Sequence, residues 1–476
     1  MIHSTQVVII GAGPGGYTAA FLAADLGLTV TLIDESSRPG GVCLYRGCMP
    51  SKALLHAAKV LTDAREATRL GVDFGEPSVD LDRLRAWKDE VVARLTGGLR
   101  QLSQQRSVTF IQGMASFVDA HTVSVASGVT DGDAEHQQIK FDHAILATGS
   151  RPSHPAPLAL DDARVLDSTG ALDIQHVPTS LLVIGGGYIG LELGTVYAAL
   201  GSEVTVVEMT ANLLSGVDRD LVRVIARRLN RVMKAIHLET MVTGLTAAAD
   251  GIAVAFEGPA ITDQVQRFDA VLVAVGRVPN SNVPGLDRTK VELDSRGFVQ
   301  VDPQRRTTEH SIFAIGDVAG EPMLAHKAFR EARVAVETIA GRPAAFECKA
   351  IPAVVFTDPE VAWCGLTETA AAEAGRSVRV AKFPWGASGR AMTMDRPEGV
   401  TKLIFEPDTE CLLGVGLVGT GAGELIAEGV VAVEMGATAS DLKLSIHPHP
   451  TLSETIMEAA EVFFGQATHI HRPRKS

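Results

Sequence analysis

The feature that most constrains this chain is a local unit that occurs twice: a strand, a glycine-rich turn, a helix, and a second strand closed by an acid. The first unit contains Gly11-Ala12-Gly13-Pro14-Gly15-Gly16 and ends at Asp34, and the second contains Gly185-Gly186-Gly187-Tyr188-Ile189-Gly190 and ends at Glu208. In a G-x-G-x-x-G turn the first glycine makes the tight bend, the second admits a pyrophosphate, and the third lets helix and strand pack closely. The helix N-terminus then faces the phosphates. The sequence therefore predicts two dinucleotide-binding units of the α/β class.

The two acids that close these units indicate which part of a dinucleotide each one binds. Asp34 and Glu208 stand where a carboxylate accepts a hydrogen bond from a ribose hydroxyl. A 2′-phosphate would meet a like charge at Glu208, and no arginine occurs between Glu208 and Asp218 to bind one. The second unit is therefore predicted to prefer NAD; a solvated strand end is the alternative for Glu208.

Two cysteines, Cys43 and Cys48, follow the first unit closely. A regular helix would separate their Cα atoms by about 7.5 Å along its axis, whereas a disulfide needs roughly 4.4–6.8 Å. The pair can therefore form a bridge only if the segment between them departs from a regular helix, which Gly47 makes easier. Lys52 follows Cys48 by about one helical turn and would favour its thiolate. We hypothesise a working redox dithiol; two buried structural cysteines are the alternative.

Further strands and helices are predicted along the rest of the chain. Apolar residues at helical spacing predict a long helix over 81–102 that packs against the first unit. A strand over 311–315 runs into Gly316-Asp317, where Asp317 is either a site residue or a cap for the following turn. Beyond Pro343 a separate α+β domain is predicted, with strands over 353–356, 401–405 and 413–417 and helices over 424–435 and 452–464.

The last chemically informative cluster is His447-Pro448-His449-Pro450-Thr451-Leu452-Ser453-Glu454. Pro450 disfavours helical geometry at His449 and so holds it in an extended pose. Glu454 is placed to orient the imidazole of His449 and to support its protonated form, as an acid does beside a catalytic base. The alternative is structural, because Thr451-x-x-Glu454 has the pattern of a capping box that opens a helix.

Length and composition set outer limits on these hypotheses. A chain of 476 residues exceeds one hydrophobic core, so about three domains are expected. The net charge of −13 argues against nucleic acid and anionic membrane surfaces as main partners. Five cysteines, an odd number, favour a reducing compartment. Residues 2–24 lack Asp, Glu, Lys and Arg, but glycines and a proline interrupt them and no basic segment precedes them. We therefore expect a soluble, cytoplasmic protein.

Six segments, taken together, resemble those of one enzyme family. They are GGVCLYRGCMPSK, GGGYIGLELG, VAVGRVPN, IFAIGD, MLAHKA and HPHPTLSE, in this order along the chain. From its first strand to its last helix the chain resembles the FAD-dependent pyridine nucleotide–disulfide oxidoreductases, and within them the members that oxidise protein-bound dihydrolipoamide to lipoamide. The resemblance implies two Rossmann-like dinucleotide-binding domains, for FAD and NAD, and a C-terminal α+β dimerisation domain.

The resemblance also implies a division of the chain and a set of partners. The division is a FAD-binding domain with the dithiol over 1–150, an NAD-binding domain over 151–279, a segment completing the FAD domain over 280–349, a dimerisation domain over 350–470, and a basic tail over 471–476. The implied partners are a second copy of the chain, lipoyl domains, and the acyltransferase core of 2-oxo acid dehydrogenase complexes. A glycine cleavage system is the other assembly that would use such a subunit. Nucleic acid, a membrane and a metal are not implied.

Residue by residue, the resemblance carries over the family's site. The implied FAD contacts are Gly11, Gly13, Gly16, Asp34, Lys52, Ala115, Thr148, Gly149, Asp317 and Ala325. The implied NAD contacts are Gly185, Gly187, Tyr188, Ile189, Gly190, Glu208, Val242 and Gly276. The implied catalytic residues are Cys43, Cys48, Lys52, His449 and Glu454. In the implied reaction, His449 of one subunit takes a proton from a dihydrolipoyl thiol, whose thiolate attacks Cys43 of the other subunit. Cys48 is released against the flavin, and electrons pass through FAD to NAD.

Some positions depart from the family's usual residues, and some exclude its other members. Tyr45-Arg46 replaces small and apolar residues, and Arg46 either lowers the thiol pKa values, alters the lipoyl channel or faces solvent. Tyr188 either gates the nicotinamide pocket or simply packs against its neighbours.

Other members of the family fit the sequence less well. A glutathione-type reductase would prefer NADPH, which Glu208 disfavours. Mercuric or thioredoxin reductases need a second redox pair near the C-terminus, whereas no cysteine follows Cys411. A flavin-bearing assembly subunit without turnover would not need the cysteines, the histidine and its acid.

Overall fold

The computed structural model describes residues 2–127, 135–259, 261 and 263–471. Its N-terminal part is built on a seven-stranded sheet of order β3-β2-β1-β6-β5-β4, with β17 paired to β6. The bounds are β1 Ile2–Ile10, β2 Val30–Asp34, β3 Thr109–Gln112, β4 Met114–Asp119, β5 Thr122–Ser127, β6 Glu135–Leu146 and β17 Ile312–Ala314. Residues Val7, Val8 and Ile9 of β1 are fully buried, as expected for a parallel strand covered on both faces.

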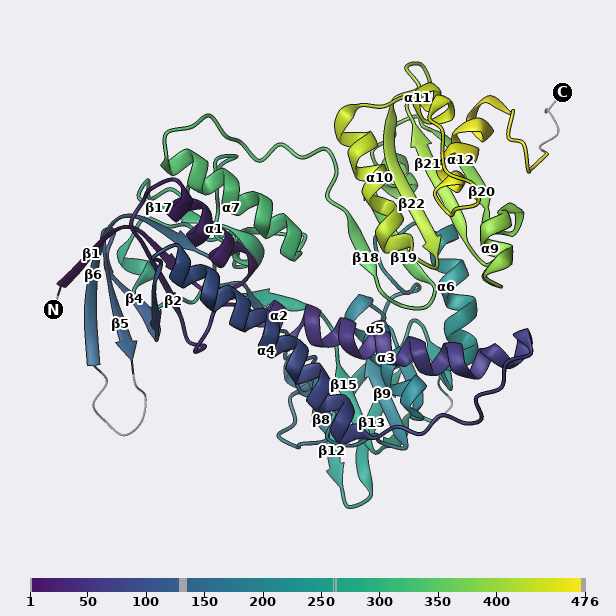
Figure 1. Cartoon of the computed structure of the whole chain (residues 1–476). Helices are drawn as coiled ribbons and strands as arrows, with labels where there is room; N and C mark the ends of the chain where they lie inside the picture. The colour runs from purple at the N-terminus through teal and green to yellow at the C-terminus, as the bar shows by residue number, and fades with distance from the viewer. Residues whose placement is uncertain (1, 128–134, 260, 262, 472–476) are drawn as a thin grey trace.

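The chain returns to this first sheet after building a second one. Strand β17 pairs in parallel with β6, so Ile312 lies opposite Ala144. Helices α1 (Pro14–Asp25) and α7 (Ala325–Ile339), which are far apart in the sequence, pack side by side next to this sheet (Figure 1). Residues from two distant parts of the chain therefore complete one layer.

The second unit has a parallel five-stranded sheet of order β11-β10-β9-β15-β8. The bounds are β8 Val165–Leu166, β9 Ser180–Ile184, β10 Glu203–Val207, β11 Ala235–His237 and β15 Ala270–Val273. Its helices are α5 (Tyr188–Leu200) and α6 (Arg219–Val232), and a small antiparallel sheet of β12 (Met241–Ala248), β13 (Gly251–Glu257) and β14 (Val265–Phe268) lies beside it. The second strand–turn–helix–strand unit predicted from the sequence is therefore present at the predicted place.

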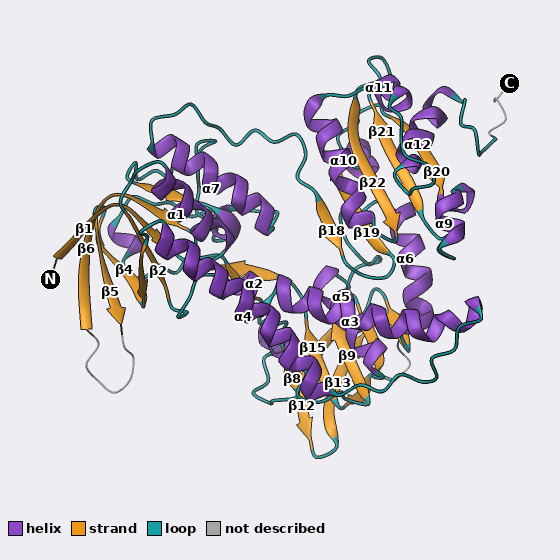
Figure 2. Ribbon diagram, viewed as in Figure 1, coloured by secondary structure: helices purple, strands orange, loops and turns teal. Residues whose placement is uncertain are grey.

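The C-terminal part is an α+β unit, as predicted. Its antiparallel sheet has the order β18-β19-β22-β21-β20, and helices lie beside it (Figure 2). The strands are β18 Ala353–Val355, β19 Glu360–Gly365, β20 Arg379–Pro384, β21 Val400–Phe405 and β22 Leu412–Gly419. The helices are α8 Glu368–Glu373, α9 Gly389–Thr393, α10 Ala422–Met435, α11 Ala439–Leu444 and α12 Glu454–Phe464.

Three helices follow the first two strands and connect the units. They are α2 (Gly41–Arg46), α3 (Cys48–Glu66) and α4 (Leu81–Gln105). In Figure 1 α4 runs from the first unit toward the second, while α3 lies between the second unit and the C-terminal one. Helix α4 contacts α1 and β3 of the first unit as expected. Its first turn, with Leu81 and Leu84, also packs against the apolar core of the second unit, so α4 makes the expected contact and a second one that was not predicted.

The three units share buried contacts. One apolar cluster includes Leu54 of α3, Leu181 of β9 and Val355 of β18. The ammonium of Lys402 in β21, which is almost fully buried, lies 2.7 Å from Asp218 beside α6 and 2.6 Å from Glu368 in α8. Hydrophobic packing and a buried ion cluster therefore fix the second unit to the C-terminal one.

The sequence also led us to expect a protein without a membrane span and with a basic C-terminal tail. Among the described residues no helix is both long and apolar enough to cross a bilayer. The predicted basic tail lies outside the described residues apart from its first position.

Candidate active site

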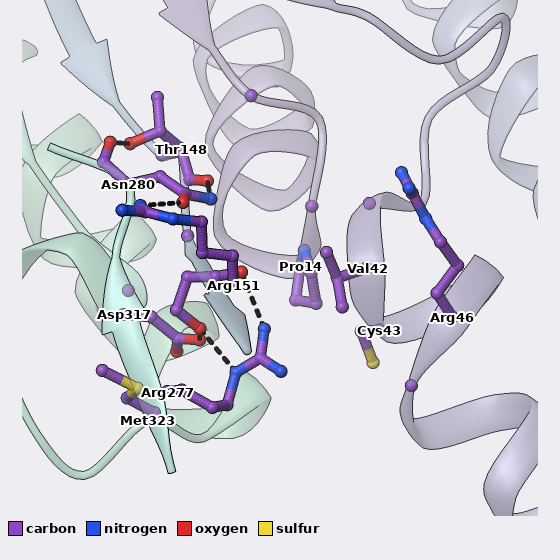
Figure 3. A pocket seen from close by; sticks show the side chains of 18 of the residues that line it. Pro14, Val42, Cys43, Arg46, Thr148, Arg151, Arg277, Asn280, Asp317 and Met323 are labelled. Carbon is purple, nitrogen blue, oxygen red and sulfur yellow. Dashed lines mark hydrogen bonds between the residues drawn. The ribbon is translucent and has the colours of Figure 1, made fainter. Parts of the chain in front are cut away.

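A cavity of about 920 Å³ opens between the first and second units. Its wall contains the turn that precedes α1, the helix α2 and the start of α3, together with residues near β7 (Ser150–Pro152) and β16 (Arg277–Pro279) (Figure 3). The predicted residues that line it are Gly11, Gly13, Asp34, Cys43, Cys48, Lys52, Ala115, Thr148, Gly149, Tyr188, Ile189, Asp317 and Ala325. One cavity therefore joins the dithiol with most of the predicted FAD contacts.

The first glycine-rich turn has the close approaches that its motif predicts. A Cβ at Gly11, where φ is +98°, would lie 2.3 Å from the carbonyl oxygen of Ala147, and a Cβ at Gly16 would lie 1.8 Å from the carbonyl oxygen of Gly11. Gly16 does not line the cavity, because it packs helix α1 closely against the turn. Gly13, in contrast, faces the cavity, so the backbone is free to approach a ligand there.

The two closing acids are held by matching hydrogen bonds in the two units. Asp34 accepts from the N–H groups of Ala12 at 2.7 Å and Ser36 at 2.8 Å. Glu208 accepts from the N–H groups of Gly186 at 2.7 Å and Thr210 at 2.8 Å, which occupy the same positions of the second motif. Each carboxylate is thus oriented by its own turn. The motif located these acids, but the hydrogen bonds that orient them were not predicted.

Most of the predicted NAD contacts lie away from this cavity. Only Tyr188 and Ile189 of that set line it. The others lie in three places: Gly185, Gly187, Glu208 and Gly276 in loops at the carboxyl ends of strands of the second sheet, Gly190 in the first turn of α5, and Val242 in β12. Of the predicted NAD contacts, only those at the N-terminus of α5 therefore reach the cavity, with Tyr188 at the junction.

The two cysteines lie on separate helices, as the spacing argument required. Cys43 belongs to α2 and Cys48 begins α3, while Gly47 between them has φ −150° and ψ −112°, outside helical geometry. Both cysteines are free thiols. The Cys43 thiol donates a hydrogen bond to Cys48, and this bond together with the Lys52 ammonium lowers the pKa of Cys48 to about 7 despite burial. The same hydrogen bond and burial raise the pKa of Cys43. Cys48 is thus the thiol of the pair that ionises more readily.

Lys52 has an acidic partner that sequence reasoning missed. Its Nζ lies 2.8 Å from Oε2 of Glu192, a side chain that is only 4% exposed. Glu192 is the single charged residue of the otherwise apolar helix α5. An isolated acid in an apolar helix was a signal that could have identified it.

Asp317 is held by a chain of polar contacts across the cavity wall (Figure 3). Its Oδ2 accepts a hydrogen bond from the hydroxyl of Ser150 at 2.5 Å, and that hydroxyl accepts one from Nε of Arg277 at 2.7 Å. Asp317 is therefore bonded across to β7, which favours a site role over a turn cap. Beside it, the Thr148 hydroxyl donates to the carbonyl of Asn280 at 2.7 Å.

His449 and Glu454 form a pair, but they lie outside the cavity. Nδ1 of His449 is 2.9 Å from Oε1 of Glu454, and the His449 side chain is 76% exposed. Oε2 of Glu454 accepts from the Thr451 N–H at 2.8 Å, whereas the Thr451 hydroxyl donates to the carbonyl of Pro448. Only half of the predicted capping box is therefore present. Although burial would raise it, hydrogen bonds from Thr451 and His449 hold the pKa of Glu454 below its ordinary value.

Tyr45 and Arg46, the two unusual residues between the cysteines, have different surroundings. The Tyr45 hydroxyl donates to the carbonyl of Arg38 at 3.2 Å. Arg46 is exposed and lines the mouth of the cavity, and Figure 3 shows its side chain pointing away from the Cys43 sulfur. An influence of Arg46 on the lipoyl channel stays a prediction.

Comparison with known proteins agrees with this geometry. The model of the pyridine nucleotide-disulphide oxidoreductase family matches residues 5–332, and the model of that family's dimerisation domain matches residues 351–460. The chain belongs to this family. It is 50% identical to a dihydrolipoyl dehydrogenase of Haemophilus influenzae, covering 98% of this chain and 96% of the relative. It is 47% identical to one of Vibrio cholerae, covering 98% and 97%.

Solved structures of family members have the same fold. LpdA from Mycobacterium tuberculosis matches with a TM-score of 0.88 at 27% identity, over 96% of this chain and 99% of that one. The HOCl-induced flavoprotein disulfide reductase RclA from Escherichia coli matches with a TM-score of 0.84 at 28% identity, over 96% and 99%. The predicted fold class, with two dinucleotide-binding units and a dimerisation unit, is confirmed.

Proposed function

We propose that this chain is a dihydrolipoyl dehydrogenase that uses FAD and NAD to oxidise protein-bound dihydrolipoamide to lipoamide. The observation that carries the proposal is the dithiol itself: Cys43 and Cys48 line one cavity with the first dinucleotide turn and with Tyr188 of the second. Disulfide exchange coupled to a redox cofactor requires a thiolate, a cation beside it and a dinucleotide-binding site next to both. Cys48, Lys52 and the first glycine-rich turn can supply these parts.

The residues present fit a flavin dinucleotide in the first unit. The turn at Gly13 gives an open backbone approach, Asp34 is oriented at the wall, and the cavity of about 920 Å³ is large enough for a cofactor of this size. FAD, when bound, supplies the two-electron redox chemistry and NAD accepts the hydride. Asp34 and Asp317 would hold the polar parts of the FAD, and Lys52 would lie by its reactive ring.

The chain's own residues can carry the thiol chemistry. A lipoyl thiol gives its proton to Nε2 of His449, and the resulting thiolate attacks the Cys43 sulfur of the oxidised pair. The Cys43–Cys48 bond breaks, a mixed disulfide forms, and Cys48 leaves as a thiolate, which its lowered pKa favours. The second lipoyl thiol then attacks the lipoyl sulfur of the mixed disulfide and closes the lipoyl disulfide, while its proton passes to Cys43, which is released as a thiol. The two electrons of the substrate remain on the reduced pair.

The base must come from a second copy of the chain. In one chain His449 does not line the cavity that holds the cysteines, and residues 351–460 match the family's dimerisation domain. Large apolar side chains are exposed on the C-terminal unit that carries His449, and they include Val431, Met435, Leu444 and Ile446, the last of which is 98% exposed. We therefore infer a homodimer in which His449 and Glu454 of each subunit face the dithiol of the other.

Glu208 favours NAD over NADP, because its carboxylate is fixed by the turn and would repel a 2′-phosphate.

The proposed partners are lipoyl domains and the acyltransferase core of a 2-oxo acid dehydrogenase complex, and the proposed location is the cytoplasm. The division at 150, 279 and 349 is supported by the pairing of β17 with β6, which returns the third segment to the first sheet.

A lipoamide-dependent NADH oxidation assay on the flavin-loaded protein tests this function, with NADPH and oxidised glutathione in parallel. We expect turnover with NADH and lipoamide only. Comparable rates with NADPH would refute the assignment of Glu208, and a flavin-loaded protein without lipoamide turnover would refute the substrate.

A further inference from the structure

Phe356 contacts both members of the Lys52–Glu192 ion pair, although it comes from the C-terminal unit. It follows β18 directly, and its backbone N–H donates to Oε1 of Glu192 at 2.9 Å. The other carboxylate oxygen of Glu192 accepts from Nζ of Lys52 at 2.8 Å. Both oxygens of this buried carboxylate are thus satisfied, one by α3 and one by the C-terminal unit.

The ring of Phe356 covers the lysine at the same place. Nζ of Lys52 lies 4.5 Å from the ring centroid, within the range of a cation–π contact. The ring is itself held, because it is partly buried and packs against the apolar cluster that joins the three units. Lys52 is therefore fixed from two sides, by a carboxylate of α5 and by an aromatic face of the C-terminal unit.

We propose that Phe356 is a positioning residue that holds the Lys52 ammonium beside the Cys48 sulfur. A lysine side chain has several freely rotating bonds, and one ion-pair partner leaves its head group free to swing into water. The aromatic face restricts that freedom and covers one side of the ammonium against solvent, which strengthens its attraction for a nearby thiolate. The inference rests on the proposed function, because that function gives the Cys48 thiolate its role.

The test measures how readily Cys48 ionises, independently of any lipoamide turnover. In the flavin-loaded, full-length protein with Cys43→Ser, the rate of alkylation of Cys48 by iodoacetamide is followed against pH by peptide mass spectrometry, which scores the other cysteines separately. Phe356→Leu removes the aromatic face but keeps the backbone N–H, and Phe356→Tyr is the matched control that keeps both. We expect Phe356→Leu to move the alkylation midpoint upward by about half a pH unit, or about threefold in rate below the midpoint.

Combination with Lys52→Met shows whether the effect passes through the lysine. We expect Lys52→Met to raise the midpoint by more than Phe356→Leu does, and the two changes together to give no further rise. The proposal would be overturned if the alkylation midpoints were equal in the parent, Phe356→Leu and Phe356→Tyr. It would also be overturned if Phe356→Leu shifted the midpoint equally with and without Lys52→Met. Phe356→Met replaces Phe356→Leu if the latter loses its flavin. Absence of lipoamide turnover would refute the proposed function while leaving these profiles readable.

Discussion

At the scale of single residues, the site depends on acids that orient a base or a cation. Glu192 fixes Lys52, Asp317 is bonded through Ser150 to Arg277, and Glu454 is bonded to His449. In the last pair Nδ1 faces the carboxylate, so Nδ1 carries the proton and Nε2 is the free basic nitrogen.

Glu454→Gln and His449→Gln test this pair. We expect His449→Gln to slow dihydrolipoamide oxidation by about 10²–10⁴-fold, the usual contribution of a general base, and Glu454→Gln to slow it less. Reduction of a dye by NADH does not need the base and is expected to continue. A Glu454→Gln protein with a lower melting temperature and normal turnover would show that Glu454 only caps α12.

The depressed pKa of Glu454 also predicts how stability depends on pH. A carboxyl group whose pKa is lower in the folded chain stabilises it at pH values above the ordinary carboxyl pKa of about 4.3, and this stabilisation is lost as pH falls through the folded value. The melting temperatures of the wild type and Glu454→Gln are therefore expected to converge below about pH 4. A difference that stays constant with pH would contradict the hydrogen-bonded carboxylate.

At the scale of elements, the break between α2 and α3 places the two cysteines. Gly47 interrupts what would otherwise be one helix, so Cys43 and Cys48 lie on different axes. A Cβ at Gly47 would lie 3.0 Å from the carbonyl oxygen of Val42, tighter than such contacts usually are. Val42 and Cys43 belong to the same short helix, so relief of this contact would move Cys43 relative to Cys48.

Gly47→Ala tests the break, with Gly98→Ala in α4 as the matched control. We expect Gly47→Ala to reduce lipoamide turnover by about 10²-fold, because small misplacements of reacting groups have effects of this size. Gly98 is an exposed helical glycine with open space around a Cβ, so its replacement should stabilise the fold by about 0.5–1 kcal/mol without changing turnover. Thiol titration after mild oxidation measures the bridge. A normal disulfide and normal turnover in Gly47→Ala would refute this account.

At the scale of the whole molecule, the site is assembled from all three units. The first contributes the cysteines, the second contributes Glu192 and Tyr188, and the C-terminal unit contributes Phe356. The proposed base arrives only when a second chain docks. Exposed apolar side chains on the C-terminal unit, above all Ile446, are the surface expected to mediate that docking.

Ile446→Asp is therefore expected to weaken the dimer and to lower lipoamide turnover in proportion to the monomer formed, while dye reduction continues. Sedimentation velocity gives the oligomeric state and the two assays give the activities. Val265→Asp, on an exposed apolar position of β14 in the second unit, serves as the control and should leave the dimer intact. A monomeric Ile446→Asp protein with full lipoamide turnover would contradict a base supplied by the partner.

The sequence by itself determined the two dinucleotide units, the place of their closing acids and the dithiol. These features are local, because the glycine spacing dictates a turn and because Cys43, Gly47 and Lys52 lie within one short segment. The sequence could single out Glu192 as an unusual acid, but it could not show which groups contact Glu192, Ser150, Arg277 and Phe356, since each reaches the cavity or the lysine from a distant part of the chain. Their proximity is decided by how the three sheets pack. The tertiary structure also places His449 away from the cysteines of its own chain, as the resemblance had implied, because the loop between α11 and α12 of the C-terminal unit carries that histidine.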